Sequence, residues 1–321
     1  MGIDIQRRRI LSLAAAGGVA SLLPEIPFAA DNLTVRIGYQ KSSTLITVLK
    51  ANGTLEKRLE PLGAKISWHE FTSGLPLLEA LNVGSVDFSA DVADTVPVFA
   101  LAAGAKVAYV AQEAPSPTAQ ALVVRAESPI RSVADLKGKR VAVAKAAGAH
   151  YLLIALLEKH GLKFKDIEPA YLSPADGRAA FERGSVDAWV IWDPFLAAVQ
   201  RQTQIRVVAD GKGVADYQRY YLTSLSFLGE RSNILSVFFD ELKNTGRWVK
   251  QNPVAAAQQL APLWGLDAAT VEAANARRSY EVRLVTPESL VEQQRIADTF
   301  HAEGLLPRKV SIAVTLWKPS V

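Results

Sequence analysis

Residues 84–87 read Gly-Ser-Val-Asp, and the same four residues return one hundred positions later at 184–187. Each copy follows a short helical pattern and leads into an apolar stretch typical of a strand. Beyond each strand lies an aspartate with a proline close behind it, within 94–97 and 193–194. Two copies are too few for a solenoid, so the repeat predicts two similar βαβαβ lobes with a cleft between them. The repeated aspartates of the two copies are expected to be structural.

Apolar segments of strand length alternate with helical patterns along most of the chain. Strands are expected at 33–39, 64–71, 86–90, 107–112, 121–125, 140–144, 170–172, 186–191 and 205–209. Strands that alternate with helices form parallel sheets, so the predicted fold class is α/β. The extended segments 121–125 and 220–227 are expected to cross between the lobes. We therefore expect two βαβ-rich lobes with parallel-dominated sheets, joined by a two-stranded hinge.

The order of these segments predicts how the chain is divided. Residues 31–122 and 225–321 are expected to form the first lobe, and residues 123–224 the second. From residue 232 onward the pattern is helical, with helices expected near 234–250, 253–263, 268–274 and 287–303.

The first thirty residues have the composition of an export signal. Three arginines at 7–9 precede an apolar run at 10–23, which is too short to span a bilayer comfortably. Ala29-Ala30 offers a processing site. Two interpretations stay open, a twin-arginine signal and an ordinary secretion signal with an arginine-rich start. Either one predicts that residues 1–30 direct export and that the protein is soluble and periplasmic.

Composition excludes several classes of protein. The 36 Lys and Arg residues are interspersed with 32 Asp and Glu residues, which gives a formal charge of +4 and no basic stripe. No nucleic-acid partner is therefore expected. The chain has no cysteine, which excludes disulfides, thiol nucleophiles, thiolate metal sites and a lipid-anchored N-terminus. The four histidines lack helical metal spacing and no nucleophile–base pair stands out, so we expect no metal, cofactor or catalytic residue.

The strand ends indicate where a ligand binds. In open parallel sheets, ligands bind beyond the carboxyl ends of the strands. That rule selects the loops 40–44, 72–74, 91–95, 145–150 and 192–194. Several of these loops enter helix N-termini, where free N–H groups and the helix dipole favour anions. The sequence thus predicts an anion-binding cleft.

Six segments, several of them at these loops, resemble those of a known family. They are 37–41 (Ile-Gly-Tyr-Gln-Lys), 77–88, 132–139, 179–189, 192–194 (Trp-Asp-Pro) and 276–280 (Ala-Arg-Arg-Ser-Tyr). Across residues 31–321 the chain resembles the substrate-binding proteins of bacterial aliphatic sulfonate ABC importers. These belong to a wider group of taurine, nitrate and thiamine-precursor binding proteins.

The resemblance implies both a fold and a function. The fold would be type II periplasmic-binding-protein-like. The protein would be the periplasmic solute-binding component of an ABC importer, a monomer that binds an organosulfonate between its lobes and delivers it to a membrane permease. It would not be an enzyme. The alternatives left open are a binding protein for taurine, nitrate or a thiamine precursor, an exported enzyme on the same fold, and a sensory module that passes its closed form to a receptor.

Twelve residues of the selected loops are candidates for ligand binding. They are Gln40, Ser42, Ser43, Ser73, Gly74, Asp94, Ala147, Gly148, Ala149, His150, Trp192 and Asp193. Neutral side chains and backbone N–H groups of residues 40–43, 73–74 and 148–149 are expected to hold the sulfonate head group. The tail is expected to lie against Trp192 and the alanines within 146–149.

Each candidate also has a structural alternative. The serine-containing loops can simply cap helices, Gly148 can serve only as a turn residue, and Trp192 can belong to the core. Asp94 and Asp193 can cap helices or orient N–H donors, because a bare carboxylate would repel a sulfonate. His150 is the only histidine expected near the cleft.

Two loops depart from the pattern of the family. Residues 93–96 read Ala-Asp-Thr-Val where the family usually has Gly-Asp-Ala/Thr-Pro. Residues 145–149 read Lys-Ala-Ala-Gly-Ala where it usually has Lys-Gly-Ser-Asn. Methyl groups replace side-chain donors, so we expect a more apolar pocket that accepts a bulkier or different sulfonate.

Overall fold

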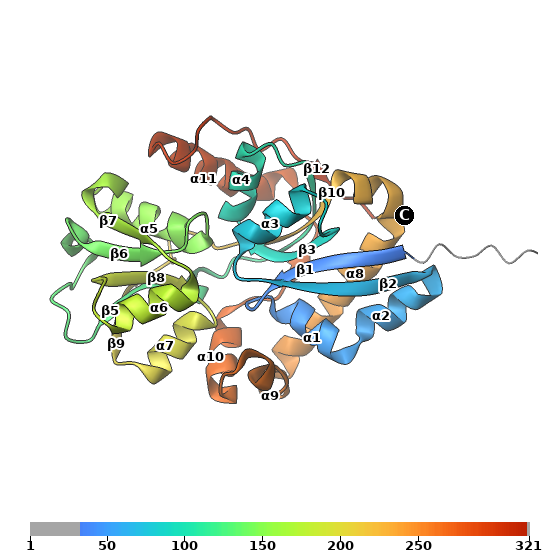
Figure 1. Cartoon of the computed structure of the whole chain (residues 1–321), viewed down its shortest axis with the longest axis horizontal. Coiled ribbons are helices and arrows are strands. Elements are labelled where there is room, and N and C mark those ends of the chain that lie inside the picture. The colour runs from blue at the N-terminus through green and yellow to red at the C-terminus, as the bar shows by residue number, and fades with distance from the viewer. Residues whose placement is uncertain (1–32, 320–321) are drawn as a thin grey trace, which may run out of the picture. The chain divides into compact units, whose positions relative to one another are not determined.

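Residues 33–319 are described by the computed structural model, and they contain two β-sheets (Figure 1). The predicted export signal at 1–30 lies outside the described residues. The first sheet has the strand order β11-β4-β10-β3-β1-β2, with β12 paired to β4. Its strands are β1 (Leu33–Gln40), β2 (Ala64–Phe71), β3 (Phe88–Ala93), β4 (Val107–Glu113), β10 (Arg219–Ser224), β11 (Val282–Arg283) and β12 (Thr315–Leu316).

The second sheet has the order β7-β6-β8-β5-β9. Its strands are β5 (Gln120–Arg125), β6 (Arg140–Val143), β7 (Glu168–Tyr171), β8 (Ala188–Trp192) and β9 (Ile205–Asp210). In each sheet one strand, β1 or β6, is parallel to both of its neighbours. Strand β5 is the first strand after the chain crosses into the second sheet, and β10 is the first after it returns. Each of them is antiparallel to both of its neighbours. The prediction of two largely parallel α/β sheets is confirmed.

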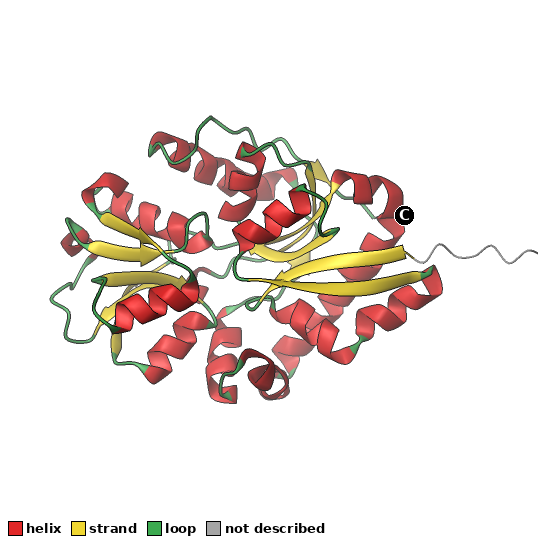
Figure 2. Ribbon diagram, viewed as in Figure 1, coloured by secondary structure: helices red, strands yellow, loops and turns green. Residues whose placement is uncertain are grey.

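Helices cover the faces of both sheets (Figure 2). They are α1 (Thr44–Asn52), α2 (Thr54–Leu59), α3 (Gly74–Asn82), α4 (Thr95–Ala102), α5 (Gly148–Lys159), α6 (Pro174–Glu182), α7 (Phe195–Gln202), α8 (Leu225–Gln251), α9 (Pro253–Trp264), α10 (Ala268–Arg277) and α11 (Val291–Ala302). None of these helices in residues 33–319 combines the length and apolar character needed to cross a bilayer.

The chain passes twice between the sheets. It leaves β4 for β5 through residues 114–119 and returns from β9 to β10 through residues 211–218. Strand pairing puts β10 in the first sheet, although residues 219–224 fall within the range expected for the second lobe. The exact division into lobes at 122/123 and 224/225 stays a prediction.

One segment differs from its predicted conformation. Residues 220–227 were expected to be extended throughout, but α8 begins at Leu225. The Ser224 hydroxyl oxygen accepts a hydrogen bond from the Phe227 N–H at 3.2 Å and so caps this helix. A serine cap stabilises a helix start even where the following residues are apolar enough to suggest a strand.

The two Gly-Ser-Val-Asp copies make the same contacts in the two sheets. Asp87 donates its N–H to the Arg36 carbonyl at 2.8 Å, and its carboxylate accepts from the Arg36 N–H at 2.8 Å. Asp187 makes the same reciprocal pair with Arg140, again at 2.8 Å in both directions. Arg36 lies in β1 and Arg140 in β6, which are equivalent strands. The prediction that the copies occupy equivalent places is confirmed.

The glycine of each copy has a conformational role. Gly84 and Gly184 both have φ of +74°, a left-handed conformation that glycine adopts without a Cβ penalty. They end α3 and α6 and turn the chain into β3 and β8, whose residues are all buried. The equivalent turns therefore bring Asp94 and Asp193 to the carboxyl ends of equivalent strands.

The repeat provides a matched pair of variants. Asp87 also accepts hydrogen bonds from the Arg36 side chain, at 3.0 Å from Nε and 2.6 Å from Nη2. Asp87→Ala is therefore expected to lower the free energy of unfolding by about 2 kcal/mol, and Asp187→Ala by about 1 kcal/mol. Urea denaturation of the two variants measures this difference. An equal loss of unfolding free energy in the two variants would show that the Arg36 side chain adds nothing to the stabilisation by Asp87.

Candidate functional site

The carboxyl ends of β1, β3 and β8 and the start of β10 surround a small cavity between the two sheets, which we call the central cavity. It is lined by Gln40, Gly74, Ala93, Val96, Ala147, Gly148, Trp192, Tyr217 and Arg219. The first sheet and the loops at its edge supply one wall. The start of α5 and the end of β8 supply the opposite wall. Loops from both sheets thus converge on one place.

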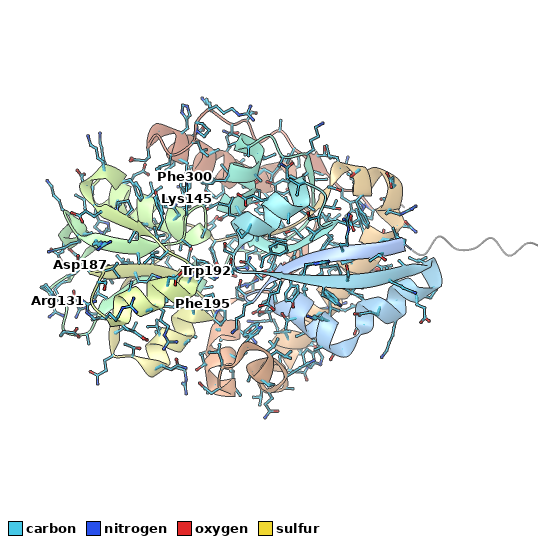
Figure 3. All side chains as sticks on the ribbon, viewed as in Figure 1. Arg131, Lys145, Asp187, Trp192, Phe195 and Phe300 are labelled. Atoms are coloured by element: carbon cyan, nitrogen blue, oxygen red, sulfur yellow. The ribbon has the colours of Figure 1, made fainter. Side chains whose placement is uncertain are left out.

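Five of the twelve predicted residues line the central cavity. They are Gln40, Gly74, Ala147, Gly148 and Trp192. Trp192 lies on the side of the second sheet that faces the first sheet (Figure 3). The Gln40 amide nitrogen donates to the carbonyl of Asp91 at 3.0 Å, so this side chain is held in place by β3.

Gly148 brings the two walls into close contact. A Cβ atom added at this position would lie 2.5 Å from the Tyr217 ring and 3.0 Å from the Ala93 Cβ. These distances are far shorter than van der Waals contact, so only glycine permits the approach. Gly148 is also the first residue of α5, and its N–H therefore lies at the positive end of that helix dipole.

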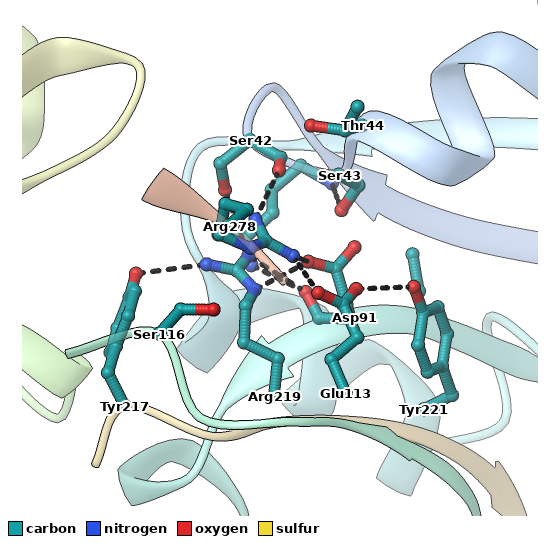
Figure 4. A network of polar contacts seen from close by, with 12 residues as sticks. Ser42, Ser43, Thr44, Asp91, Glu113, Ser116, Tyr217, Arg219, Tyr221 and Arg278 are labelled. Carbon is teal, nitrogen blue, oxygen red and sulfur yellow. Dashed lines mark hydrogen bonds and ion pairs between the residues drawn. The ribbon is translucent and has the colours of Figure 1, made fainter. Parts of the chain in front are cut away.

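Beside the cavity lies a buried network of four charged side chains (Figure 4). The Asp91 carboxylate accepts from Arg219 Nε at 2.5 Å and from Arg278 Nη2 at 3.1 Å. Arg278 Nη2 also donates to Glu113 at 2.6 Å. All four side chains are at most 3% exposed. Two guanidinium groups and two carboxylates balance one another, which offsets part of the cost of burying charge.

The network extends to the cavity wall through Arg219. Its Nη1 donates to the Tyr217 hydroxyl at 2.9 Å and its Nη2 to the Ser42 hydroxyl at 3.2 Å. Burial raises the pKa of Tyr217 to about 12, so the hydroxyl keeps its proton. No acceptor among residues 33–319 takes that proton, which leaves it available to a ligand.

Sequence reasoning missed Tyr217 and Arg219. Tyr217 lies in the returning connection and Arg219 at the start of β10, just before the segment 220–227 that was expected only to cross between the lobes. One signal was present, because a single arginine stands at the start of an otherwise apolar extended stretch. A charged residue in a buried strand requires a partner of opposite charge.

A second cavity lies next to the first. It is lined by Ser42, Thr44, Asp193, Pro194, Trp264, Ala274, Asn275, Arg278 and Tyr280. Two predicted residues, Ser42 and Asp193, line this cavity and not the central one. Its residues come from the start of α1, the end of β8 and the α9–α10 region.

Asp193 connects the second sheet to the C-terminal helices. Its carboxylate accepts from Arg277 Nη1 at 2.8 and 3.0 Å, and from the Ala197 N–H at 3.0 Å. Arg277 Nη2 also donates to the Gln200 side chain. Burial raises the pKa of Asp193 to about 7, although Arg277 opposes the shift. Asp193 therefore both caps α7 and ties it to α10.

Asp94 occupies the equivalent strand end but forms no ion pair with any residue of 33–319. Its carboxylate accepts from the Thr95 N–H at 2.9 Å and from the Gln218 N–H at 3.0 Å. It does not line the central cavity. Burial is the main cause that raises its pKa to about 7, against the opposing effect of these N–H donors.

Three other predicted residues lie near the cavity without lining it. The Ser43 hydroxyl oxygen accepts from the Gln40 N–H at 3.3 Å, and Ser43 itself is fully buried. Ser73 precedes α3 without a side-chain cap bond. Ala149 is buried in the first turn of α5.

His150 is surrounded by aromatic rings. Its ring centroid lies 5.2 Å from that of Phe164, 5.4 Å from Tyr171 and 4.9 Å from Phe300. Its Nδ1 accepts from the Ala146 N–H at 3.3 Å, and burial lowers its pKa to about 3. The imidazole is therefore neutral and supports the loop before α5. Residues 33–319 contain no group of three or more histidine, aspartate or glutamate side chains placed to hold a metal ion.

Known proteins resemble this chain in sequence as well as in fold. The profile of the NMT1/THI5-like family matches residues 70–256. A candidate aliphatic sulfonates-binding protein of Escherichia coli (strain K12) is 38% identical over 317 residues, which is 98% of each chain. The taurine-binding periplasmic protein of the same organism is 28% identical and covers 65% of this chain and 61% of its own length.

Solved structures give the same picture. The alkanesulfonate-binding protein SsuA from Xanthomonas axonopodis pv. citri, bound to MOPS, has 39% identity and a TM-score of 0.82 over 87% of this chain and 96% of its own. The periplasmic aliphatic sulphonate binding protein SsuA from Escherichia coli has 39% identity and a TM-score of 0.81 over 89% of this chain and 92% of its own.

The fold with its cavity between two sheets is that of the periplasmic binding proteins. Within that class, the chain belongs to the NMT1/THI5-like family, as the match to the family profile and the 38% identity over nearly the whole chain both show. The desulfurization enzyme DszB, at 16% identity and a TM-score of 0.62, shares the fold alone.

The raised pKa of Asp94 predicts how stability changes with pH. In the folded protein this pKa is about 7, against an ordinary value of 3.8. The folded state therefore holds a proton that the unfolded state releases between these values, so lower pH favours folding. From about pH 7.5 to about pH 5.5, this group should add roughly 2 kcal/mol to the free energy of unfolding.

Asp94→Asn should remove this pH-dependent contribution to the free energy of unfolding. The separate contribution of Asp193, whose pKa burial also raises to about 7, should remain. Urea denaturation of wild type and variant at both pH values checks it. The same pH dependence in the two proteins would show that Asp94 is ionised at neutral pH.

Proposed function

We propose that the protein is the periplasmic solute-binding component of an ABC importer and that it binds an organosulfonate in the central cavity. The observation that carries the proposal is the cavity itself, in which loops from both sheets combine hydrogen-bond donors with apolar walls. Two solved proteins with 39% identity over most of this chain are sulfonate-binding proteins.

The donors of the cavity suit a sulfonate head group. A sulfonate is a permanent anion with three acceptor oxygens and no proton to donate. Tyr217, Gly148 and Arg219 line the cavity, and they carry a hydroxyl, a backbone N–H and a guanidinium group. Gln40 can join them by exchanging its bond to the Asp91 carbonyl for one to the ligand. Charge-assisted hydrogen bonds of this kind are stronger than neutral ones.

The remaining walls suit an apolar tail. Ala93, Val96, Ala147 and the Trp192 ring line the cavity between the donors. Ala93 and Ala147 belong to the two loops that depart from the family pattern. Their methyl groups support the expectation of a more apolar pocket that accepts a bulkier or different sulfonate. No carboxylate lines the central cavity within the described chain, so an ammonium group would have no counter-charge there.

We assign each sheet, with its helices, to one lobe of a protein that opens and closes on its ligand, which places residues 120–122 in the second lobe and 219–224 in the first instead of the reverse expected from the sequence. The crossing segments 114–119 and 211–218 would form the hinge. The Asp193–Arg277 ion pair joins α7 to α10. The close contact of Gly148 with Tyr217 fits a closed state, in which the two walls of the central cavity touch. A ligand shifts the equilibrium only as far as it binds the closed state better.

Export and delivery complete the proposal. Residues 1–30 would direct export, the mature chain would act as a monomer, and a membrane permease would recognise its closed form. Enzymatic turnover is not supported, because the relatives with 38–39% identity are described as binding proteins and the chain has no cysteine nucleophile.

Isothermal calorimetry with a series of alkanesulfonates tests the site. Tyr217→Phe removes the hydroxyl and keeps the ring, so sulfonate affinity should fall roughly ten- to a hundredfold through the lost charge-assisted hydrogen bond. Gln40→Ala should have an effect of the same order or smaller, because Gln40 must first release Asp91. Tyr221→Phe is the matched control, since the Tyr221 hydroxyl donates to Glu113 at 2.8 Å and does not line the cavity.

Two results would reject this assignment. One is that no alkanesulfonate binds the wild type, which would also reject the proposed function. The other is that Tyr217→Phe and Tyr221→Phe bind every sulfonate as tightly as the wild type, which would move the site elsewhere.

Gly148→Ala tests closure. The added Cβ would lie 2.5 Å from the Tyr217 ring, so the walls cannot approach as they do here. Affinity should fall at least about tenfold, while the unfolding midpoint of the ligand-free protein changes little. Gly229→Ala is the control, because nothing lies within 4 Å of its added Cβ. Wild-type affinity in Gly148→Ala would show that closure does not need this contact.

A further inference from the structure

The second cavity contains more hydrogen-bond donors than the protein uses. Among residues 33–319, the buried nitrogens Trp264 Nε1, Asn275 Nδ2 and Arg278 Nε have no hydrogen-bond partner. All three residues line this cavity, with exposures of 4%, 3% and 3%. A buried donor without an acceptor costs free energy, so such groups normally meet a ligand or an ordered water.

The surrounding bonds explain why these donors are left over. The Asn275 carbonyl oxygen accepts from the Tyr280 hydroxyl at 2.7 Å, which leaves the Asn275 NH₂ group directed away from that bond. Arg278 uses Nη2 for Asp91 and Glu113 and Nη1 for the Ser42 carbonyl, which leaves Nε. Tyr280 thus fixes Asn275 and the network of charged residues fixes Arg278, and within the described residues an N–H of each is left unpaired.

The charges around the cavity decide what kind of acceptor fits. Arg278 is paired with Asp91 and Glu113, and Asp193 is paired with Arg277. Within the described residues, these pairs leave no net charge at the cavity to attract a second anion. A neutral oxygen, such as that of an ether or a hydroxyl, fits this set of donors best.

The two cavities adjoin each other. Arg219 lines the central cavity, and its Nη2 donates to the hydroxyl of Ser42, which lines the second. On the opposite wall, Trp192 lines the central cavity and its neighbour Asp193 the second. A ligand that has its head group in the central cavity can therefore extend its tail past Ser42 toward Trp264 and Asn275.

We infer that the second cavity receives a neutral, hydrogen-bond-accepting oxygen in the tail of the bound organosulfonate. The inference rests on the proposed function and narrows it. The preferred ligand is a sulfonate whose chain carries an ether or hydroxyl oxygen several atoms from the sulfur. Trp264 and Asn275 act as residues that determine specificity and do not contact the head group.

Pairs of sulfonates that differ only by CH₂ against oxygen test this inference. Calorimetry compares butanesulfonate with 2-methoxyethanesulfonate, and pentanesulfonate with 3-methoxypropanesulfonate. Wild-type protein should bind at least one ether roughly three- to tenfold more tightly than its alkane partner, the gain expected from one net hydrogen bond. Trp264→Phe, which keeps the ring packing and removes the N–H, should bring that ratio close to one without changing alkanesulfonate affinity.

A control variant and a direct readout complete the test. Trp248→Phe removes an indole N–H from α8, outside both cavities, and should keep the ether preference. In nitrogen-15 spectra, the Trp264 indole signal, identified by its loss in Trp264→Phe, should shift with the ether and stay in place with the alkane.

The possible results separate the inference from the proposed function. If the wild type binds alkanesulfonates but binds each ether no more tightly than its alkane partner, the inference is overturned. Ordered water alone then fills the second cavity, and the proposed function is left intact. An ether preference that persists in both Trp264→Phe and Asn275→Leu also overturns it. If no sulfonate binds at all, the proposed function fails and this inference fails with it.

Discussion

The bridge that Asp91 makes between Arg219 and Arg278 is the interaction on which the site depends. Asp91 belongs to β3, Arg219 to β10 and Arg278 to the end of α10, so one carboxylate ties the middle of the first sheet to the C-terminal helices. Removing it would leave two buried guanidinium groups short of an acceptor, which is far more costly than losing an exposed ion pair. The bridge also positions Ser42 and Tyr217 through Arg219, and so shapes both cavities.

The placement of the cavity follows from the repeat. The two Gly-Ser-Val-Asp copies start β3 and β8 from the same kind of turn and anchor them to β1 and β6 through the same reciprocal backbone pair. Their carboxyl ends then face each other, one from each sheet. Asp94 and Asp193, at these ends, differ: within the described residues the first accepts only from N–H and O–H groups, and the second pairs with Arg277.

The relation to sulfonate-binding proteins fits a cavity that relies little on net charge. A solute-binding protein must hold its ligand and later release it to a partner. Donors fixed by internal ion pairs can stabilise an anion without a free counter-charge, which limits the desolvation cost on closing. The alanines of the two departing loops give the cavity an apolar wall. On the proposed assignment, the cavity would distinguish ligands mainly by the length and polarity of their tails.

The sequence by itself determined the two-sheet α/β fold, the loops that meet between the sheets, and Gln40, Gly74, Ala147, Gly148 and Trp192 as residues of one cavity. It could do so because strand periodicity, helix caps and the internal repeat are local or nearly local patterns. Only the tertiary structure revealed the Arg219–Asp91–Arg278–Glu113 network, the His150 aromatic cluster and the unpaired donors of Trp264 and Asn275. The charged residues of this network find their partners 128 to 187 positions away in the chain, and no local pattern records that choice.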